Sequence, residues 1–135
     1  MSAVTLKRIL YAEDEPDIRT VARMALETLG GFTLEVCSNG QEALERAPDF
    51  APDLILLDVM MPKLDGIATI QALRKVHALA TTPVVFMTAK VQPHETQELL
   101  DIGAAGVIAK PFDPMTLADN IRQIWTATTS AAGQN

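Results

Sequence analysis

Short apolar runs alternate along this chain with amphipathic stretches in which apolar residues recur every three or four positions. The runs end at polar or charged residues, which is typical of strands. They predict strands at residues 9–12, 32–37, 54–57, 84–87 and 106–109. The run Leu54–Leu57 has no polar alternation, so we expect that strand to be buried on both faces of a sheet.

The first two amphipathic stretches carry clear helix boundaries. Pro16 suits the first turn of a helix, and Gly30-Gly31 ends the apolar stripe that follows it. Asn39 and Glu42 form a variant of the capping box, in which Asn39 caps a second helix and Glu42 reaches back to it. We expect Pro48 to end that helix, because proline removes a hydrogen bond from a helix interior.

Three further helices are predicted, around residues 67–76, 93–100 and 117–125. The acids before the first and third of them, Asp65 and Asp113, are interpreted as caps. Pro93 and Pro114 suit the first turns of the second and third. From Thr126 onward the residues are small and polar, so we expect a frayed end.

The elements therefore form five successive strand–helix units, with no internal repeat. This alternation predicts an α/β fold, a doubly wound parallel sheet with helices on both faces and right-handed crossovers. The chain has 135 residues, which is the size of one ordinary domain. We predict a single domain over residues 1–126 and a flexible C-terminal tail over 127–135.

Composition narrows the class of protein. Apolar residues make up 48% of the chain, but no run approaches the ~20 apolar residues of a membrane helix. No secretory signal follows Lys7 and Arg8, so we predict a cytoplasmic protein that binds no membrane. The single cysteine, Cys37, excludes an intramolecular disulfide and is expected to be buried. The net charge of −6 predicts no direct binding to nucleic acid.

Polar residues that could carry chemistry lie where the predicted strands end. Glu13 and Asp14 follow the first strand, Asp58 the third, Thr88 the fourth and Lys110 the fifth. The carboxyl ends of parallel strands meet at one edge, where open α/β sheets bind ligands. The acids can meet there only if the first and third strands are neighbours. Each residue taken singly is more often a turn, a cap or a solvated side chain; the ordered set favours a site.

Two carboxylates at this edge would repel each other. If Asp14 and Asp58 lie ~4–6 Å apart, the repulsion is on the order of a few kcal/mol at an intermediate dielectric. Either one carboxylate takes up a proton or a cation lies between them, and Mg²⁺ suits carboxylates plus water. Lys110 adds a charge for a phosphoryl oxygen, and Thr88 adds a hydroxyl donor. Together these groups describe an aspartyl-phosphate site centred on Asp58.

Four motifs carry a resemblance to a known family. They are Ile9-Leu-Tyr-Ala-Glu13-Asp14-Glu-Pro-Asp-Ile18, Asp53-Leu-Ile-Leu-Leu-Asp58-Val-Met-Met-Pro62-Lys-Leu-Asp65-Gly66, Val85-Phe-Met-Thr88-Ala89, and Gly103-Ala104 with Lys110-Pro111-Phe112. Over roughly residues 5–126 the chain resembles the receiver domain of bacterial two-component response regulators, with its CheY-like, flavodoxin-like fold. The resemblance implies a five-stranded parallel sheet of strand order 2-1-3-4-5.

The resemblance also implies roles for the acids. Asp58 would accept a phosphoryl group from a histidine kinase or a phosphotransfer protein. Asp14 and Asp58 would bind Mg²⁺ through their side chains. Met60 would bind it through its backbone carbonyl, and Glu13 would act through a water molecule.

The fourth and fifth strands would complete the site. Lys110 would contact the phosphoryl group, Thr88 would close onto it after transfer, and the Lys110–Pro111 bond would be cis. Two positions depart from the family. Val107 stands where the family often has an aromatic ring whose rotation reports the movement of Thr88, so a backbone or helix shift must carry the signal. Met60 offers no side chain that orients water, so we predict slow to moderate self-dephosphorylation.

The leading functional hypothesis is a phosphorylation-dependent switch that catalyses its own phosphorylation and dephosphorylation. Phosphorylation of Asp58 would bias the face formed by the fourth helix, the fifth strand and the last helix, and so alter contact with a downstream protein or a homodimer partner. The alternative is a pseudo-receiver, an interaction module that is not phosphorylated. A phosphatase-type hydrolase would need a second acid two residues after the nucleophile, where this chain has Met60.

Overall fold

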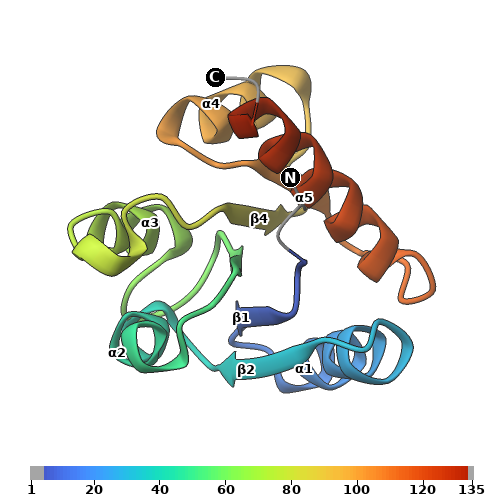
Figure 1. Ribbon diagram of the computed structural model, residues 1–135. Helices are drawn as coiled ribbons and strands as arrows, with labels where there is room; N and C mark the ends of the chain where they lie inside the picture. The colour runs from blue at the N-terminus through green and yellow to red at the C-terminus, as the bar shows by residue number, and fades with distance from the viewer. Residues whose placement is uncertain (1–4, 134–135) are drawn as a thin grey trace.

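The computed structural model of the chain describes residues 5–133, with side chains described up to Thr129. Five parallel strands form one sheet in the order β2-β1-β3-β4-β5 (Figure 1). Their bounds are Arg8–Ala12 (β1), Thr33–Cys37 (β2), Leu54–Asp58 (β3), Val84–Thr88 (β4) and Gly106–Ala109 (β5). The predicted α/β fold and the strand order implied by the resemblance are both confirmed.

Helices cover both faces of the sheet, as Figure 1 shows. Their bounds are Pro16–Arg23 (α1), Met24–Leu29 (η1), Gly40–Phe50 (α2), Gly66–Leu73 (α3), His77–Leu79 (η2), Pro93–Ile102 (α4) and Leu117–Gly133 (α5). The core accordingly has two halves. Ala22, Leu26 and Ile121 place α1, η1 and α5 against one face of the sheet. Ala43, Ile70 and Leu99 place α2, α3 and α4 against the other.

Strand β3 is the centre of the sheet, and all five of its residues are buried. Because side chains alternate across a strand, Leu54 and Leu56 enter the half of the core on the α1 and α5 side. Ile55 and Leu57 enter the half on the α2, α3 and α4 side. This burial on both faces is what the unbroken apolar run predicted.

Most of the predicted helix boundaries are confirmed in detail. Asp65 Oδ1 accepts a hydrogen bond from the backbone N of Ala68 (2.8 Å) and so caps α3. Asp113 Oδ1 accepts one from the backbone N of Met115 (2.9 Å), but this bond lies in the turn before α5, which begins only at Leu117. Asn39 caps α2 as expected. Cys37 is buried, and no helix among the described residues is long and apolar enough to cross a membrane.

The prediction that Pro48 ends the second helix is wrong, because α2 continues to Phe50. Pro48 lies in the last turn, where its missing N–H removes one i→i−4 hydrogen bond, but the helix continues for two residues beyond it. Ala51 closes that turn by donating its backbone N–H to Ala47 O (2.9 Å) and adopts a left-handed conformation with φ of 54°. Glu42 also departs from the expected capping box: its Oε1 accepts from the backbone N of Ser38 (2.9 Å).

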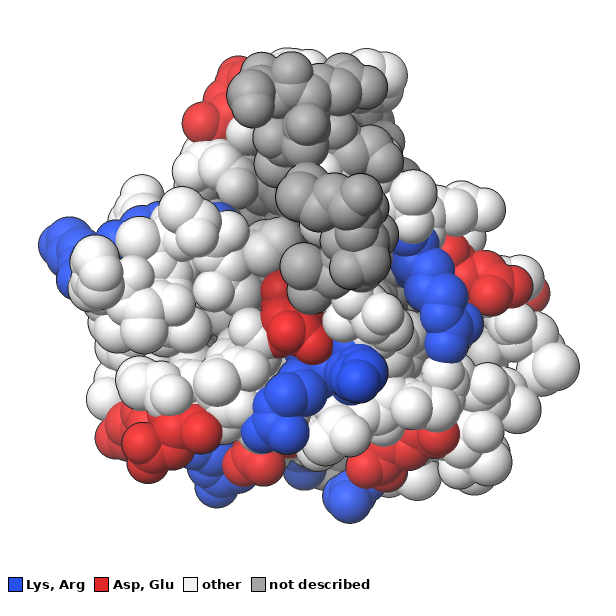
Figure 2. Space-filling model, viewed as in Figure 1, with Lys and Arg blue, Asp and Glu red and all other residues white. Residues whose placement is uncertain are grey.

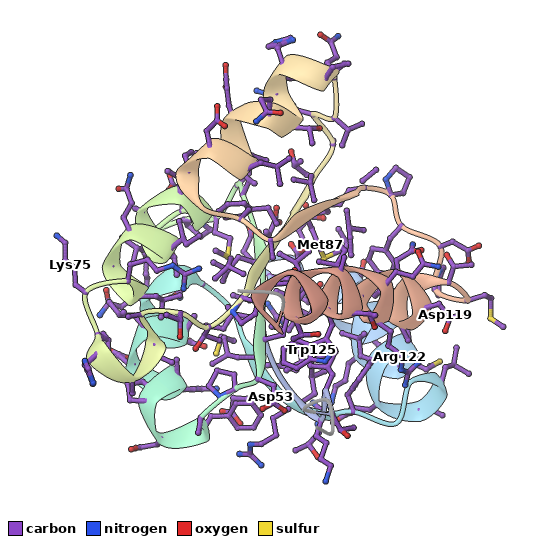
Figure 3. The ribbon with its side chains drawn as sticks, turned by 45° about the horizontal axis from the view of Figure 1, so that its top comes forward. Asp53, Lys75, Met87, Asp119, Arg122 and Trp125 are labelled. Carbon is purple, nitrogen blue, oxygen red and sulfur yellow. The ribbon has the colours of Figure 1, made fainter. Side chains whose placement is uncertain are left out.

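The first helix also changes geometry before it ends. Its second half, η1, is π-helical, and the backbone N of Gly30 bonds Ala25 O at 2.9 Å. Arg122 on α5 contacts this end of the segment: its guanidinium donates to Gly30 O and lies 4.6 Å from the centroid of the Phe32 ring. Figure 3 shows Arg122 extending from α5 toward this region, so α5 and η1 are tied together.

Helix α5 is longer than the pattern predicted. The segment 127–135, predicted as a flexible tail, is helical as far as Gly133, and residues 134–135 lie outside the described residues. The alanines in this segment favour helix, and the Thr129 hydroxyl donates to Trp125 O (2.8 Å) instead of competing with the helix.

Candidate metal centre at the carboxyl edge of the sheet

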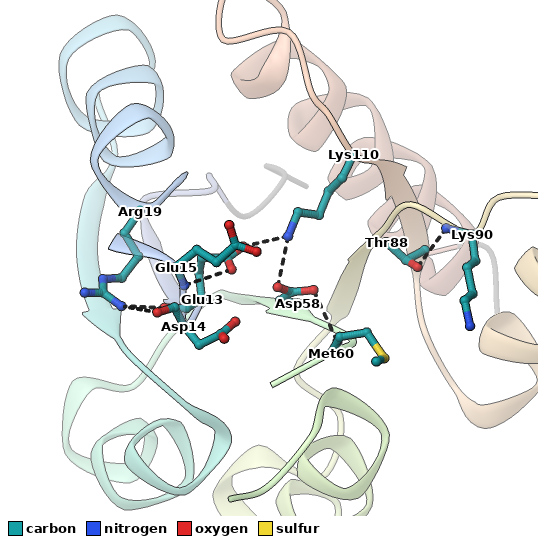
Figure 4. Close-up of polar contacts among 9 residues, drawn as sticks. All are labelled: Glu13, Asp14, Glu15, Arg19, Asp58, Met60, Thr88, Lys90 and Lys110. Atoms are coloured by element: carbon teal, nitrogen blue, oxygen red, sulfur yellow. Dashed lines mark hydrogen bonds and ion pairs between the residues drawn. The ribbon is translucent and has the colours of Figure 1, made fainter. Parts of the chain in front are cut away.

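The sheet brings Glu13, Asp14 and Asp58 together. Strands β1 and β3 are neighbours, with Ala12 opposite Leu57, so Glu13 and Asp58 follow directly on adjacent strands. One carboxylate oxygen from each of the three acids lies within 4.8 Å of the others. Figure 4 shows these carboxylates below the side chain of Lys110. The condition stated from the sequence, that the first and third strands be neighbours so that the acids can meet, is therefore fulfilled.

Asp58 lies at the last position of β3 and is only 3% exposed. Its Oδ2 accepts from Lys110 Nζ at 3.0 Å, and its Oδ1 accepts from the backbone N of Met60 at 3.3 Å. One carboxylate oxygen thus faces the ammonium group and the other faces the loop after β3. This arrangement orients the carboxyl group within the acidic cluster.

Glu13 is fully buried beside it. Its Oε1 accepts from Lys110 Nζ (3.1 Å), and its Oε2 accepts from the backbone N of Glu15 (3.3 Å). Burial and, after it, interaction with Asp58 raise the pKa of Glu13, while the hydrogen bonds from Lys110 and the backbone of Glu15 lower it; the net result is a pKa of about 7. A carboxyl group with this pKa carries only part of its charge near neutral pH.

Lys110 follows β5 and bridges Glu13 and Asp58. Burial alone would lower the pKa of Lys110, but the hydrogen bonds to Asp58 and Glu13 raise it above the ordinary value. The ammonium group therefore stays charged. It is one positive charge against the carboxylates of Glu13, Asp14 and Asp58.

This donor set fits a hard divalent cation. All three ligands are carboxylate oxygens, and Asp14 is only half-buried, which leaves the cluster open to water on one side. A cation would relieve the repulsion between the three acids. The acidic cluster can therefore hold a metal ion, and Mg²⁺ suits it because Mg²⁺ takes one or two carboxylates and keeps several waters.

Thr88 ends β4 next to this cluster and is 5% exposed. In the sheet its neighbour Met87 pairs with Asp58. The Thr88 hydroxyl oxygen accepts from the backbone N of Lys90 at 3.0 Å, so the β4–α4 loop holds it, as Figure 4 shows. The Lys110–Pro111 peptide bond is cis, as the resemblance implied.

The loop after β3 is held close to Asp58. Gly66 donates its backbone N–H to Val59 O (3.0 Å), and a Cβ at Gly66 would come within 2.6 Å of Asp58 O. Only glycine allows this approach. The side chain of Met60 is 69% exposed, while its backbone N–H is bonded to Asp58. Glycine and the Asp65 cap together place Met60 beside the cluster.

Arg19 is a residue of this site that the sequence reasoning missed. Its Nη1 donates to the backbone carbonyls of Glu13 (2.9 Å) and Asp14 (3.2 Å), and so ties α1 to the loop that carries both acids (Figure 4). The sequence feature that could have indicated this role is the position of Arg19, which lies five residues after Asp14, near the start of α1.

An apolar groove adjoins the cluster. It lies between α1 and the segment after β5, and its lining residues are Asp17, Ile18, Val21, Lys110, Pro111 and Phe112. Val21 is 43% exposed there. The groove gives a second molecule an apolar surface directly beside Lys110.

Comparison with known proteins gives consistent results. A family model described as the response regulator receiver domain matches residues 9–122. The chain is 36% identical over 126 residues to the alkaline phosphatase synthesis transcriptional regulatory protein PhoP of Bacillus subtilis, covering 93% of this chain and 51% of that protein. It is 37% identical over 119 residues to the transcriptional regulatory protein CpxR of Escherichia coli, covering 88% of this chain and 49% of that protein. The chain thus spans about half the length of these relatives.

Solved structures agree. The chemotaxis response regulator CheY4 of Vibrio cholerae superposes with a TM-score of 0.82 at 31% identity, covering 89% of this chain and 99% of that one. The receiver domain of the Francisella response regulator 1452 superposes with a TM-score of 0.80 at 30% identity, covering 90% and 98% of the two chains.

Proposed function

The chain belongs to the response regulator receiver domain family, and from this premise we propose that Asp58 accepts a phosphoryl group from a histidine kinase or a phosphotransfer protein. The observation that carries the proposal is the position of the Asp58 carboxylate. It is buried at the end of the central strand, 3.0 Å from the Lys110 ammonium and within one cluster with Glu13 and Asp14.

The transfer is a displacement at phosphorus. A carboxylate oxygen of Asp58 forms the new P–O bond while the P–N bond of the phosphohistidine breaks, and the electron pair of that bond stays on the imidazole nitrogen. Such a reaction needs positioning and charge neutralisation more than covalent help from the protein. The groove beside Lys110 offers a surface on which the donor can dock.

Each neighbouring group has a defined task. Asp14, Asp58 and the backbone carbonyl of Met60 would hold Mg²⁺, with Glu13 acting through a water molecule, and the bound ion would neutralise charge on the phosphoryl oxygens. Lys110 stays charged and can move from the two carboxylates to a phosphoryl oxygen. The Thr88 hydroxyl would leave Lys90 N and close onto the phosphoryl group.

We further propose that this closure alters the face formed by α4, β5 and α5. Thr88 ends the strand next to β5, and Lys110 directly follows β5, so both groups connect the site to that face. Val107 is half-buried on β5, opposite Phe86, and has no ring to rotate. The signal would therefore travel as a shift of backbone or helix, and would change contact with a downstream protein or a second copy.

The partners of the whole protein stay predictions. The relatives named transcriptional regulators are about twice as long as this chain, so the expectation of no direct nucleic-acid binding rests only on the charge of these residues. On the face seen in Figure 2, acidic and basic side chains lie side by side rather than forming a patch of one sign. The cytoplasmic location and the domain boundary at residue 126 likewise remain expectations.

Phosphorylation with acetyl phosphate and Mg²⁺ tests the proposal. We expect the wild type to gain one phosphoryl group by intact-mass spectrometry and the Asp58→Asn variant to gain none. Asp53→Asn is the matched control, because it makes the same change at the opposite end of β3 and keeps the oxygen acceptor. Normal labelling of the Asp58→Asn variant would refute the proposal.

The pseudo-receiver alternative gives a different outcome in the same experiment. A pseudo-receiver would leave the wild type unlabelled by acetyl phosphate or by a phosphohistidine donor. The complete set of Asp58, Thr88 and Lys110 at the carboxyl edge of the sheet supports the switch instead. The proposed catalysis is limited to the domain's own phosphorylation and dephosphorylation.

A further inference from the structure

Tyr11 is a buried residue that the proposed function does not use. It lies on β1, its side chain is fully buried, and its hydroxyl has no hydrogen-bond partner among the described residues. A buried hydroxyl without a partner is destabilising, and a phenylalanine would fill the same space without that cost. The hydroxyl therefore calls for an explanation beyond packing.

The strand aims Tyr11 toward the acidic cluster. The backbone N of Glu13 bonds Cys37 O (3.0 Å), which extends the pairing of β1 and β2 beyond Ala12. Residues two apart on a strand share a face, so Tyr11 and Glu13 project to the same side of the sheet. Tyr11 belongs to the half of the core on the α1 and α5 side.

The surroundings keep the Tyr11 hydroxyl protonated. Burial and the negative charges of Glu13 and Asp58 raise its pKa above the ordinary value, while the positive charge of Arg19 opposes them. The phenol is therefore a hydrogen-bond donor at any physiological pH.

Glu13 has room for another donor. Its two oxygens accept one hydrogen bond each, from Lys110 and from the backbone of Glu15, whereas a carboxylate can accept about four. The contact with Lys110 is the one that the proposed function removes, because Lys110 moves to the phosphoryl group. A fully buried carboxylate would then need a replacement donor.

We propose that Tyr11 is a positioning residue that donates its hydroxyl to the Glu13 carboxylate when Lys110 turns to the phosphoryl group on Asp58. The hydroxyl lacks a partner in the unphosphorylated conformation and gains one in the activated conformation. It thereby holds Glu13 in place for the metal while the lysine is engaged elsewhere. This inference rests on the proposed function of Asp58.

Tyr11 is the only tyrosine of the chain, so it can be observed without assignment. Protein labelled with ¹³C at the tyrosine ζ position gives one resonance, whose shift responds to hydrogen bonding of the phenol. We expect this resonance to move when beryllofluoride and Mg²⁺ are added together, and to move much less in the Glu13→Gln variant. A resonance that stays in place in the wild type would overturn the proposal.

The Tyr11→Phe variant gives a second, independent readout. We expect its Mg²⁺ affinity in the presence of beryllofluoride to fall about tenfold. A loss of this size is typical when a residue that hydrogen-bonds to a metal-binding side chain is removed. Without beryllofluoride its Mg²⁺ affinity and thermal midpoint should match or exceed those of the wild type, because the lost hydroxyl is unpartnered there. Equal Mg²⁺ affinity of the two proteins in beryllofluoride, measured by calorimetry, would also overturn the proposal.

Two controls separate the possible failures. Thr69→Val removes another fully buried hydroxyl, on α3, which donates to Asp65 O (2.6 Å). This variant should leave the Mg²⁺ affinity in beryllofluoride unchanged. Acetyl-phosphate labelling of the wild type tests Asp58 itself. If the wild type is labelled but the Tyr11→Phe variant has the same Mg²⁺ affinity in beryllofluoride, only the role of Tyr11 is overturned. An unlabelled wild type overturns the proposed function.

Discussion

Asp53 and Asp58 lie at opposite ends of the same strand, and their surroundings differ sharply. Asp53 Oδ2 accepts from the backbone N–H groups of Lys7 (3.0 Å) and Arg8 (2.9 Å). The Arg8 guanidinium in turn donates to Phe50 O and lies 4.2 Å from the centroid of the Phe50 ring. At this end of the sheet every one of these groups has a partner.

At the other end the charges do not balance. Asp58 shares a single ammonium group, that of Lys110, with Glu13, and Asp14 adds a third carboxylate to the cluster. On β1, two residues before Glu13, the Tyr11 hydroxyl has no partner among the described residues. Burial and, after it, the neighbouring Asp58 carboxylate raise the pKa of Glu13 to about 7.

The difference teaches how one strand can serve both stability and function. Two backbone N–H groups bond one oxygen of Asp53, so this carboxylate has a structural role at its end of the sheet. The cluster around Asp58 is incompletely neutralised, so a metal ion or a change in the position of Lys110 lowers its energy. Electrostatic imbalance at the carboxyl edge is what makes that edge responsive.

The largest expected effect comes from removing the only positive charge that is bonded to Asp58 among the described residues. We expect Lys110→Ala to lower the rate of labelling by acetyl phosphate by about 10²–10³-fold, as for loss of one charged donor to a developing anion. Rates are followed by mass spectrometry over time. Lys75→Ala, which removes an exposed lysine far from the site, is the control (Figure 3). A labelling rate within threefold of the wild type would show that Lys110 does not act on the phosphoryl group.

The raised pKa of Glu13 predicts a pH dependence of stability in the metal-free protein. The pKa rises from 4.5 to about 7 on folding, so the folded state holds a proton that the unfolded state releases in this window. The free energy of unfolding should therefore fall as pH rises, by about 2 kcal/mol between pH 5 and 7.5. Urea unfolding in EDTA measures this fall.

The Glu13→Gln variant isolates that contribution. Glutamine does not titrate, so the difference between the two proteins should shrink toward low pH and grow toward pH 7.5. A pH profile that is the same for both proteins would mean that Glu13 keeps an ordinary pKa in the folded state.

A substitution at Asp53, at the amino end of β3, should change stability but not phosphorylation. Asp53→Ala leaves the backbone N–H groups of Lys7 and Arg8 without their acceptor, so we expect a loss of about 1–2 kcal/mol in unfolding free energy. The acetyl-phosphate labelling rate of the folded variant should equal that of the wild type. A slower rate would show that the two ends of β3 are coupled, which would break the comparison.

The smallest expected effect is on the lifetime of the phosphoryl group. Met60 is 69% exposed beside Asp58 and cannot orient water, so the phosphorylated wild type should persist for longer than seconds at neutral pH. Met60→Asn should speed hydrolysis a few-fold by offering an amide to water. Met115→Asn, at a methionine of similar exposure (73%), is the control and should not change the rate.

Much of this architecture could be predicted from local pattern. The apolar run Leu54–Leu57 specified a doubly buried strand, and Asp65 specified the cap of α3, because these features depend on residues close in sequence. Pro48 shows the limit of local rules, since α2 continues for two residues beyond it although proline removes one backbone donor from the helix. The local pattern also predicted too short a last helix, because α5 continues beyond Thr126 to Gly133.

The sequence by itself determined which residues stand at the carboxyl ends of the strands, because each apolar run ends at a polar residue. Only the tertiary structure decided that Glu13 and Asp58 are adjacent, since that depends on β1 and β3 being paired. It also decided the full burial of Glu13, the contacts of Arg19 with the acidic loop and the unpartnered hydroxyl of Tyr11. Burial and charge interaction are set by residues distant in sequence, and no local pattern records them.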